Sequence, residues 1–309
     1  MRSLVQPKEK GEHMLINLRD VCRIADQNNM AVAAVNAASL EAIRAAIAVA
    51  EQTGYPIIIQ HAEVHEQYIP LTTVAPIVTA LAEQSSAQIC VHLDHCENLS
   101  YAHRALDLGF TGVMFDGSAL PYEQNVEYSQ AAADMCAEYG VGLECELGSM
   151  GSREGGGDAS EGSTAEESGA VYTDPNLAED FVRSTGLDIL ACSFGTVHGL
   201  YKGEPKLNFD VLREIRAHAN VPLVMHGGSG VSDEDNMRAI DAGVRKINYY
   251  TYGVKYAGDA VRKLVASQEA ANPDAVVYWH DMTSAAYETL VETFEHVVLN
   301  FANGAKPLA

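Results

Sequence analysis

The strongest constraint on the fold is an alternation, beginning near residue 30, between short apolar β-branched runs and stretches with apolar residues at helical spacing. This alternation is typical of βα units, whose strands pair in parallel. Eight strands are predicted, at about residues 30–36, 56–60, 88–94, 112–117, 142–148, 188–195, 222–227 and 246–251. Because the eight units follow one another without an obvious linker, the sequence predicts an α/β fold of the (β/α)8 TIM-barrel type.

The 309 residues are predicted to contain one barrel domain, over residues 14–309, because such a barrel uses about 250 residues as a single domain. Residues 1–13 are polar and are predicted to be a disordered leader or tag. Residues 149–173 hold six glycines and five acidic residues. At the strand-end face of a barrel, so long a loop favours a mobile active-site lid over a plain surface insertion. The tail has helical spacing over 281–300 and is predicted to be a helical extension that packs across the barrel.

The formal net charge of −22 argues against binding to nucleic acid or to an anionic membrane surface, because no local basic patch offsets it. A phosphorylated ligand would need a metal ion, backbone N–H groups or a few placed cations. The sequence contains no apolar run of about 18 residues, so no membrane span is predicted. The six cysteines form no CxxC pair and are interpreted as buried thiols, which predicts a reducing, cytoplasmic location.

Three histidines stand where predicted strands end, at the edge of a barrel where active sites are built. His95 lies at the end of the third strand, His198 follows the sixth and His226 lies at the end of the seventh. Three imidazoles with one open position form a catalytic Zn²⁺ geometry, in which the open position accepts a substrate oxygen. His92 is predicted to face inward, in packing or in support of a metal ligand. The sequence therefore predicts a metal centre at the mouth of the barrel.

A second candidate site is the glycine-rich run HGGSG at residues 226–230, between the seventh strand and the helix that follows it. Gly227 and Gly228 would let backbone N–H groups close on an anion, and the loops after strands seven and eight often bind phosphate in such barrels. His61 and His65 lie four residues apart, in a predicted loop after strand two. Because their order is not HExxH, the sequence favours a place outside the site for them.

At these residues the sequence resembles the class II, metal-dependent fructose-bisphosphate and tagatose-bisphosphate aldolase family. The resemblance covers residues 14–271 in order. It is carried by six blocks at consistent spacing: HLDH at 92–95, MFDGS at 114–118, ECELG at 144–148, GTVHGLYKGEPKL at 195–207, HGGSG at 226–230, and KIN at 246–248 with Thr251. The family implies a TIM barrel and an aldehyde-lyase of carbohydrate metabolism, including glycolysis.

The resemblance implies that His95, His198 and His226 bind the catalytic Zn²⁺. Glu146 matches an acidic residue that holds the metal in an alternative position in some members. Asp94 would act as the acid/base at the hydroxyl next to the breaking bond.

A loop glutamate, Glu154, is also implied by the resemblance. The positions implied in substrate binding, around the dihydroxyacetone phosphate half, are Asn36, Gly199, Lys202, Gly227, Gly228, Ser229, Asn248 and Thr251. The family further implies a monovalent cation, Na⁺ or K⁺, near Gly199. Homodimers or homotetramers are the implied assemblies.

Reversible retro-aldol cleavage of a ketose phosphate agrees with these roles. The Asp94 carboxylate can take the proton from the C4 hydroxyl. Breaking of the C3–C4 bond leaves an enediolate on the dihydroxyacetone phosphate half, and a chelated Zn²⁺ would stabilise its charge. Glu154 would then protonate carbon while closure of its loop excludes water. The products are dihydroxyacetone phosphate and an aldehyde.

Three departures from the family pattern fall on the half of the site that receives the aldehyde. Ala62 stands where the family commonly has Ser, and Tyr250 stands where it has an acidic or small polar residue. No Arg follows Arg262, although the family commonly has one near the C-terminus. Because a lost Arg removes a bidentate phosphate partner, we expect an aldehyde other than glyceraldehyde 3-phosphate. The stereochemistry, the number of phosphates and the native metal among Zn²⁺, Co²⁺ and Fe²⁺ stay open.

Three other functions are compatible with parts of the pattern. A metal-dependent hydrolase could use three histidines and an aspartate, but it would need neither a phosphate cradle nor a lid with a glutamate. A Schiff-base aldolase needs a lysine inside the barrel, and the one candidate on a strand, Lys246, is predicted to lie at the wrong end. A non-catalytic barrel subunit of an aldolase complex would be marked by the loss of a metal ligand, and all three histidines are present.

Overall fold

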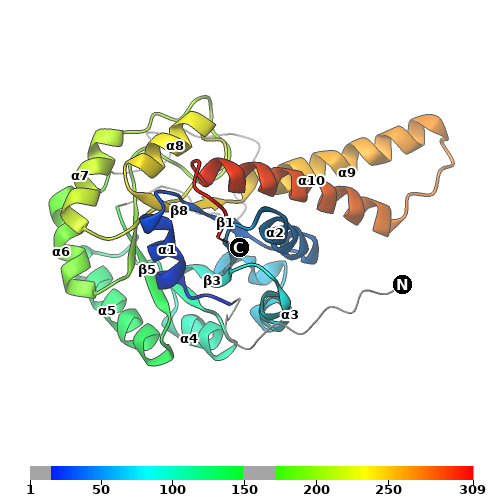
Figure 1. Ribbon diagram of the computed structural model, residues 1–309. Coiled ribbons are helices and arrows are strands. Elements are labelled where there is room, and N and C mark those ends of the chain that lie inside the picture. Colours follow the sequence, from blue (N-terminus) through cyan, green and yellow to red (C-terminus); the bar gives the residue numbers. More distant parts are fainter. Residues whose placement is uncertain (1–14, 149–171, 309) are drawn as a thin grey trace.

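The computed structural model describes residues 15–148 and 172–308 of the chain, so the predicted leader, Glu154 and nearly all of the predicted lid lie outside the described residues. Eight parallel strands close into a barrel in chain order, which confirms the predicted TIM barrel (Figure 1). The strands are β1 (Val32–Asn36), β2 (Ile57–Ala62), β3 (Ile89–Cys96), β4 (Gly112–Phe115), β5 (Gly142–Leu147), β6 (Ile189–Cys192), β7 (Leu223–Met225) and β8 (Val244–Tyr249).

Helices surround the barrel because each strand is buried along its whole length and needs an apolar cover outside. The helix expected after HGGSG is α8, which begins where the Ser232 side chain accepts a hydrogen bond from the Asp235 N–H. The helices are α1 (Leu18–Gln27), α2 (Leu40–Thr53), α3 (Leu71–Gln84), α4 (Leu99–Asp107), α5 (Tyr122–Tyr139), α6 (Pro175–Thr185), α7 (Phe209–Ala219), α8 (Asp233–Asp241), α9 (Thr251–Ala271), α10 (Trp279–Phe301) and the 3₁₀ helix η1 (Glu63–Gln67).

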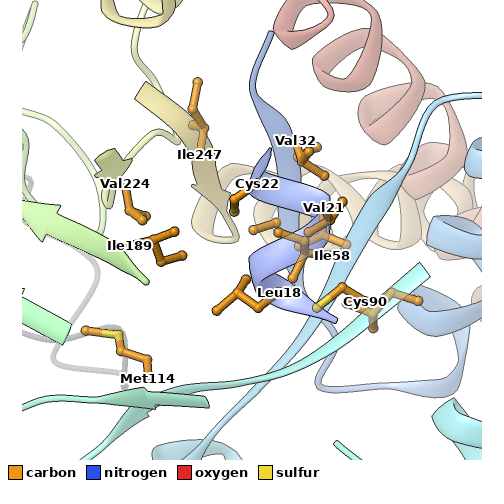
Figure 2. Close-up of a cluster of buried hydrophobic side chains, with 14 of the residues drawn as sticks. Leu18, Val21, Cys22, Val32, Ile58, Cys90, Met114, Ile189, Val224 and Ile247 are labelled. Atoms are coloured by element: carbon orange, nitrogen blue, oxygen red, sulfur yellow. The ribbon is translucent and has the colours of Figure 1, made fainter. Parts of the chain in front are cut away.

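Helix α1 closes the amino-terminal end of the barrel. Its apolar residues recur at helical spacing, and Leu18, Val21 and Cys22 are fully buried against strand residues such as Ile58 and Ile247 (Figure 2). The approach is close, because a Cβ on Gly112 would lie 2.6 Å from the Leu18 Cβ. The lower half of the barrel is therefore apolar and filled, which leaves the carboxyl ends of the strands for polar side chains.

The C-terminal helix differs from its prediction. Helices α9 and α10 form an antiparallel pair that projects from the side of the barrel (Figure 1). The later part of α10 packs most closely on the body of the protein, since Leu290, Phe294 and Phe301 are buried and the Phe301 carbonyl accepts a hydrogen bond from the Ala31 N–H. Ala286 and Tyr287, further towards its start, are partly buried against the core. The predicted packing of residues 281–300 is therefore found from Ala286 onward, and the start of α10 projects with α9 away from the barrel. Helical spacing identifies an apolar face but not the surface that covers it.

All six cysteines are buried and none forms a disulfide. Within the described parts of the chain, no helix combines the length and the apolar character needed to cross a lipid bilayer.

Candidate metal centre and active site

The three histidines singled out in the sequence converge at the carboxyl ends of the strands. The ring centroids of His95 and His226 lie 4.5 Å apart, those of His95 and His198 lie 4.9 Å apart, and those of His198 and His226 lie 5.6 Å apart. One ring nitrogen from each lies within 4.8 Å of the others, and all three side chains are buried. Three imidazole nitrogens this close together can hold one transition-metal ion.

An irregularity in β3 directs His95 into this cluster. The pairing of β3 with β4 shifts between Leu93 and Cys96, and His95 has the left-handed backbone angle φ of 44°. In a regular strand, neighbouring side chains point to opposite faces. The extra residue of the bulge lets Asp94 and His95, which are adjacent in sequence, both reach the barrel interior. A non-glycine residue at positive φ is strained, and such strain is frequent at functional sites.

Two buried carboxylates orient the histidine rings. Asp116 Oδ2 lies 2.9 Å from His95 Nδ1, and Glu144 Oε1 lies 2.8 Å from His226 Nε2. Because ionised carboxylates only accept hydrogen bonds, each of these ring nitrogens donates, and the other nitrogen of each ring is the one that can bind a metal once it is deprotonated. Those other atoms, His95 Nε2 and His226 Nδ1, are buried without a hydrogen bond. A metal ion would satisfy both, so the residues present fit a metal centre.

The third ligand, His198, is positioned through the loop after β6. The Tyr201 hydroxyl accepts a hydrogen bond from the Val197 N–H at 3.1 Å and donates one to the Gly227 carbonyl at 2.8 Å. Gly227 has φ of 64°, and a Cβ there would lie 2.2 Å from the Val197 carbonyl oxygen. Only glycine therefore allows the loop that carries His198 to pack against the loop that carries His226.

A buried ion pair lies beneath the histidines. Lys246 Nζ is 2.9 Å from Glu144 Oε2 and donates to Asn248 Oδ1 at 2.7 Å, and all three side chains are fully buried. His92 Nε2 lies 3.2 Å from the same Glu144 oxygen, which confirms its supporting position. Burial would raise the pKa of Glu144, but Lys246 and the hydrogen bond from His226 hold it well below its ordinary value. The prediction that Lys246 lies at the wrong end of the barrel is wrong, because β8 begins two residues before it and its ammonium group reaches Glu144 under the site.

The Asp94 carboxylate is held by two amides. Asn36 donates to Asp94 Oδ2 at 2.8 Å and Asn248 donates to Asp94 Oδ1 at 3.1 Å. The Asn36 oxygen in turn accepts from Gln60 at 2.9 Å. Burial would raise the pKa of Asp94, but His95 and Lys246 lower it, so this carboxylate is ionised at neutral pH. Asn36 and Asn248, both predicted to bind substrate, thus hold Asp94, the predicted proton acceptor.

The local potential also suits a cation. Burial alone would lower the pKa of His95, yet the carboxylates of Asp94 and Asp116 raise it to about 10. Burial and the neighbouring Asp116 raise the pKa of Glu146 well above its ordinary value. Glu146 Oε2 lies 3.5 Å from His226 Nδ1, and Glu146 joins His95 and Asp116 in a second group of possible ligands. A cation would relieve the crowding of these carboxylates.

The glycine-rich run after β7 is tightly packed. The Gly228 N–H donates to the Asn248 carbonyl at 3.1 Å, so that amide is already used, and the Ser229 hydroxyl accepts from the Tyr250 N–H at 3.0 Å. Thr251 begins α9 beside this run. Gly199 has φ of 90°, and the nearby Lys202 side chain is exposed. These residues surround the carboxyl ends of β6, β7 and β8, where the sequence predicted a phosphate cradle.

The neighbouring part of the rim, over β1 and β2, holds Ala62 and Tyr250, two of the residues that depart from the family pattern. Ala62 ends β2 in register with Asp94. The histidine pair is not in a loop as predicted, because His61 belongs to β2 and His65 to η1. His65 is fully buried, and its ring centroid lies 4.9 Å from that of Tyr250.

Sequence reasoning missed four residues that support the site: Asp116, Glu144, Gln60 and Tyr201. Asp116 and Glu144 carry a usable signal, since Asp116 directly follows an apolar strand run and Glu144 is an acidic residue inside one. Gln60 and Tyr201 give none, because their roles depend on contacts with distant segments.

A sequence model of one protein family, described as fructose-bisphosphate aldolase class-II, matches residues 16–303. A sulfofructosephosphate aldolase from Alkalicoccus urumqiensis is 40% identical over 220 residues, which cover 71% of this chain and 75% of the relative. A fructose-bisphosphate aldolase from Staphylococcus epidermidis is 34% identical over 298 residues, 94% of this chain and 99% of the relative. Among solved structures, the YdjI aldolase from Escherichia coli K12 matches with a TM-score of 0.80 and 28% identity, covering 94% of this chain and 98% of that one.

Proposed function

The chain belongs to the class II fructose-bisphosphate aldolase family, and on that premise we propose that this aldehyde-lyase cleaves a ketose phosphate into dihydroxyacetone phosphate and an aldehyde other than glyceraldehyde 3-phosphate. The observation that carries the proposal is the convergence of His95, His198 and His226 beside the clamped carboxylate of Asp94. The uncharged side chains of Ala62 and Tyr250 at the rim support an aldehyde other than glyceraldehyde 3-phosphate.

The residues of the chain support a stepwise reaction. His95, His198 and His226 would hold a divalent metal ion, we propose Zn²⁺, which supplies a Lewis acid for the carbonyl end of the substrate. Asp94, ionised and fixed from two sides, would take the proton of the C4 hydroxyl as the C3–C4 bond breaks. Glu154 keeps the role implied by the resemblance, as the acid that returns a proton to C3.

Binding of the dihydroxyacetone phosphate half is assigned to the rim at β6, β7 and β8. The proposed contacts are Asn36, Gly199, Lys202, Gly227, Gly228, Ser229, Asn248 and Thr251, with Na⁺ or K⁺ near Gly199. Because Asn36 and Asn248 already bond Asp94, we expect them to act on the substrate chiefly through that carboxylate.

A coupled assay tests the proposed reaction. Fructose and tagatose 1-phosphates and the matching 1,6-bisphosphates are offered to the protein, and dihydroxyacetone phosphate is measured with metal supplied. We expect faster turnover of one or more 1-phosphates, inactivation by a chelator and recovery with Zn²⁺. A clear preference for fructose 1,6-bisphosphate would contradict the proposed aldehyde. Trapping of a covalent adduct by borohydride would contradict metal-dependent cleavage, since Lys246 is held in an ion pair.

We also propose a homo-oligomer, a dimer or tetramer, in a reducing cytoplasm. An apolar groove runs between the projecting helix pair and α2, lined by Tyr68, Val254, Met282 and Trp279, whose side chain is 74% exposed. Exposed patches of this kind often mark subunit interfaces. Light scattering should give a mass of two or four chains for the native protein, and Trp279→Asp should lower it; a monomeric native protein would contradict this.

A further inference from the structure

We propose that His65, backed by Tyr250, determines substrate specificity by hydrogen bonding to a hydroxyl group at the far end of the aldehyde half. This inference rests on the proposed function and narrows it to an uncharged, hydroxyl-bearing aldehyde. It follows from the position of one buried histidine that no step of the reaction uses.

The strand register places His65 next to the reacting groups. Ala62 is paired with Asp94 across β2 and β3, and His65 follows only three residues later in η1. Tyr250 follows β8, on the other side of β1. Because β1 lies between β2 and β8 in the barrel, His65 and Tyr250 meet over its carboxyl end, above Asn36. Their contact forms the rim over β1 and β2, and Tyr250 continues this rim to Ser229, whose hydroxyl accepts a hydrogen bond from the Tyr250 N–H at 3.0 Å.

The ring of His65 has unused hydrogen-bonding capacity. Its Nδ1 and Nε2 are both buried, and neither has a hydrogen-bond partner among the described residues. Its neighbour His61 differs, since His61 Nε2 lies 3.1 Å from the Tyr101 hydroxyl. Buried polar atoms in folded proteins are nearly always satisfied, so these two nitrogens mark a place for a polar partner from outside the chain, which a substrate hydroxyl can supply.

Burial does not separate His65 from a substrate. Asp94 and His226 are, like His65, fully inaccessible to solvent in this structure. Burial alone therefore does not distinguish His65 from residues of the metal centre.

The chemistry of the site favours a hydroxyl over an anion. Burial lowers the pKa of His65 to about 4, so the ring is neutral and offers one donor and one acceptor. A hydroxyl group uses both. A phosphate or sulfonate would instead need a charged partner, and the carboxylate of Asp94, which acts electrostatically on His65, would repel it.

The test measures condensation of dihydroxyacetone phosphate with four aldehydes: glyceraldehyde, lactaldehyde, glyceraldehyde 3-phosphate and a sulfonated lactaldehyde. Wild-type protein should prefer glyceraldehyde to lactaldehyde, which lacks the terminal hydroxyl, by at least roughly tenfold in kcat/KM. His65→Phe should abolish that preference, mainly by raising KM for glyceraldehyde, and His65→Asn should retain part of it. The matched control His61→Asn alters a neighbouring buried histidine that has its own partner, and it should keep the wild-type preference.

A second readout separates specificity from structural damage. Exchange of the C3 proton of dihydroxyacetone phosphate with solvent needs no aldehyde, so His65→Phe should reduce glyceraldehyde condensation at least roughly tenfold more than exchange. Equal losses in both, or an unchanged preference in His65→Phe, would overturn the role of His65. A wild-type preference for the phosphate or the sulfonate would overturn it as well. Absence of any condensation or exchange by the wild-type protein would instead overturn the proposed function itself.

Discussion

Replacement of Lys246 by Met is the most direct test of the charge arrangement under the metal centre. The substitution keeps an unbranched side chain but removes the ammonium group that lies 2.9 Å from Glu144 Oε2 and 2.7 Å from Asn248 Oδ1. Both partners are fully buried, so Glu144 would keep a negative charge with only the two imidazoles of His92 and His226 facing it. Breaking a buried pair from one side costs about 3–5 kcal/mol, and we expect that loss in the free energy of unfolding.

The measurement is urea unfolding of metal-free protein, so that metal binding does not compensate for the lost charge. Lys263→Met is the matched control, because Lys263 is exposed on α9 and its loss should change the unfolding free energy by less than about 0.5 kcal/mol. In the double variant Lys246→Met with Glu144→Gln, both charges are gone. The double variant should lose at least about 1 kcal/mol less unfolding free energy than the sum of the losses in the two single variants, because the two groups are in direct contact.

Two results would refute the reasoning. A loss of less than about 1 kcal/mol in Lys246→Met would show that water or protonation of Glu144 neutralises the site without the lysine. Strict additivity in the double variant would show that the ammonium and the carboxylate do not stabilise one another.

Three further predictions follow from the same structure. Gly227→Ala places a Cβ 2.2 Å from the Val197 carbonyl oxygen, so it should separate the loops of His198 and His226 and lower metal affinity about 10–100-fold. Metal affinity is measured by competition with a chromogenic chelator. Gly258→Ala, with open space around it, is the control, and equal metal affinities in the two variants would contradict the prediction. Leu18→Ala should destabilise the barrel by about 2–5 kcal/mol in urea unfolding while leaving metal affinity unchanged, because Leu18 is fully buried at the far end; a coupled loss of metal would show that α1 supports the site. The depressed pKa of His65, about 4 against an ordinary 6.5, means that the unfolded chain binds a proton in this interval that the folded chain does not. The contribution of His65 is therefore complete above pH 6.5 and is lost as the pH falls towards 4, at up to roughly 1.4 kcal/mol per pH unit, a slope that His65→Asn should lack.

The alternation of apolar runs was sufficient to predict all eight strands, because strand and helix periodicity are local properties of the sequence. Helix α1, which closes the amino-terminal end of the barrel, was not predicted, although Leu18, Val21 and Cys22 have helical spacing. A single short amphipathic segment outside the repeated βα pattern gives too weak a signal. The projecting pair of α9 and α10 could not be predicted either, since periodicity does not say which partner an apolar face meets.

At the site, the sequence predicted which side chains gather but not how they are connected. His95, His198 and His226 could be selected because each lies at or just beyond the carboxyl end of a predicted strand. The bulge that turns His95 inward has no sequence mark, since it arises from the pairing of β3 with β4. Nor does the sequence show that Asn36 and Asn248 bond to Asp94, because strands far apart in the chain bring them together.

The irregularity in β3 has a consequence for how such a protein can diversify. With the extra residue there, a single peptide bond joins the side chain that accepts the proton to one that grips the metal, so covalent geometry rather than packing sets their separation. Residues that line the pocket can then be substituted without changing the distance between the proton acceptor and the metal ligand. A library that randomises positions 62, 65 and 250 should accordingly yield new aldehyde preferences far more often than inactive proteins.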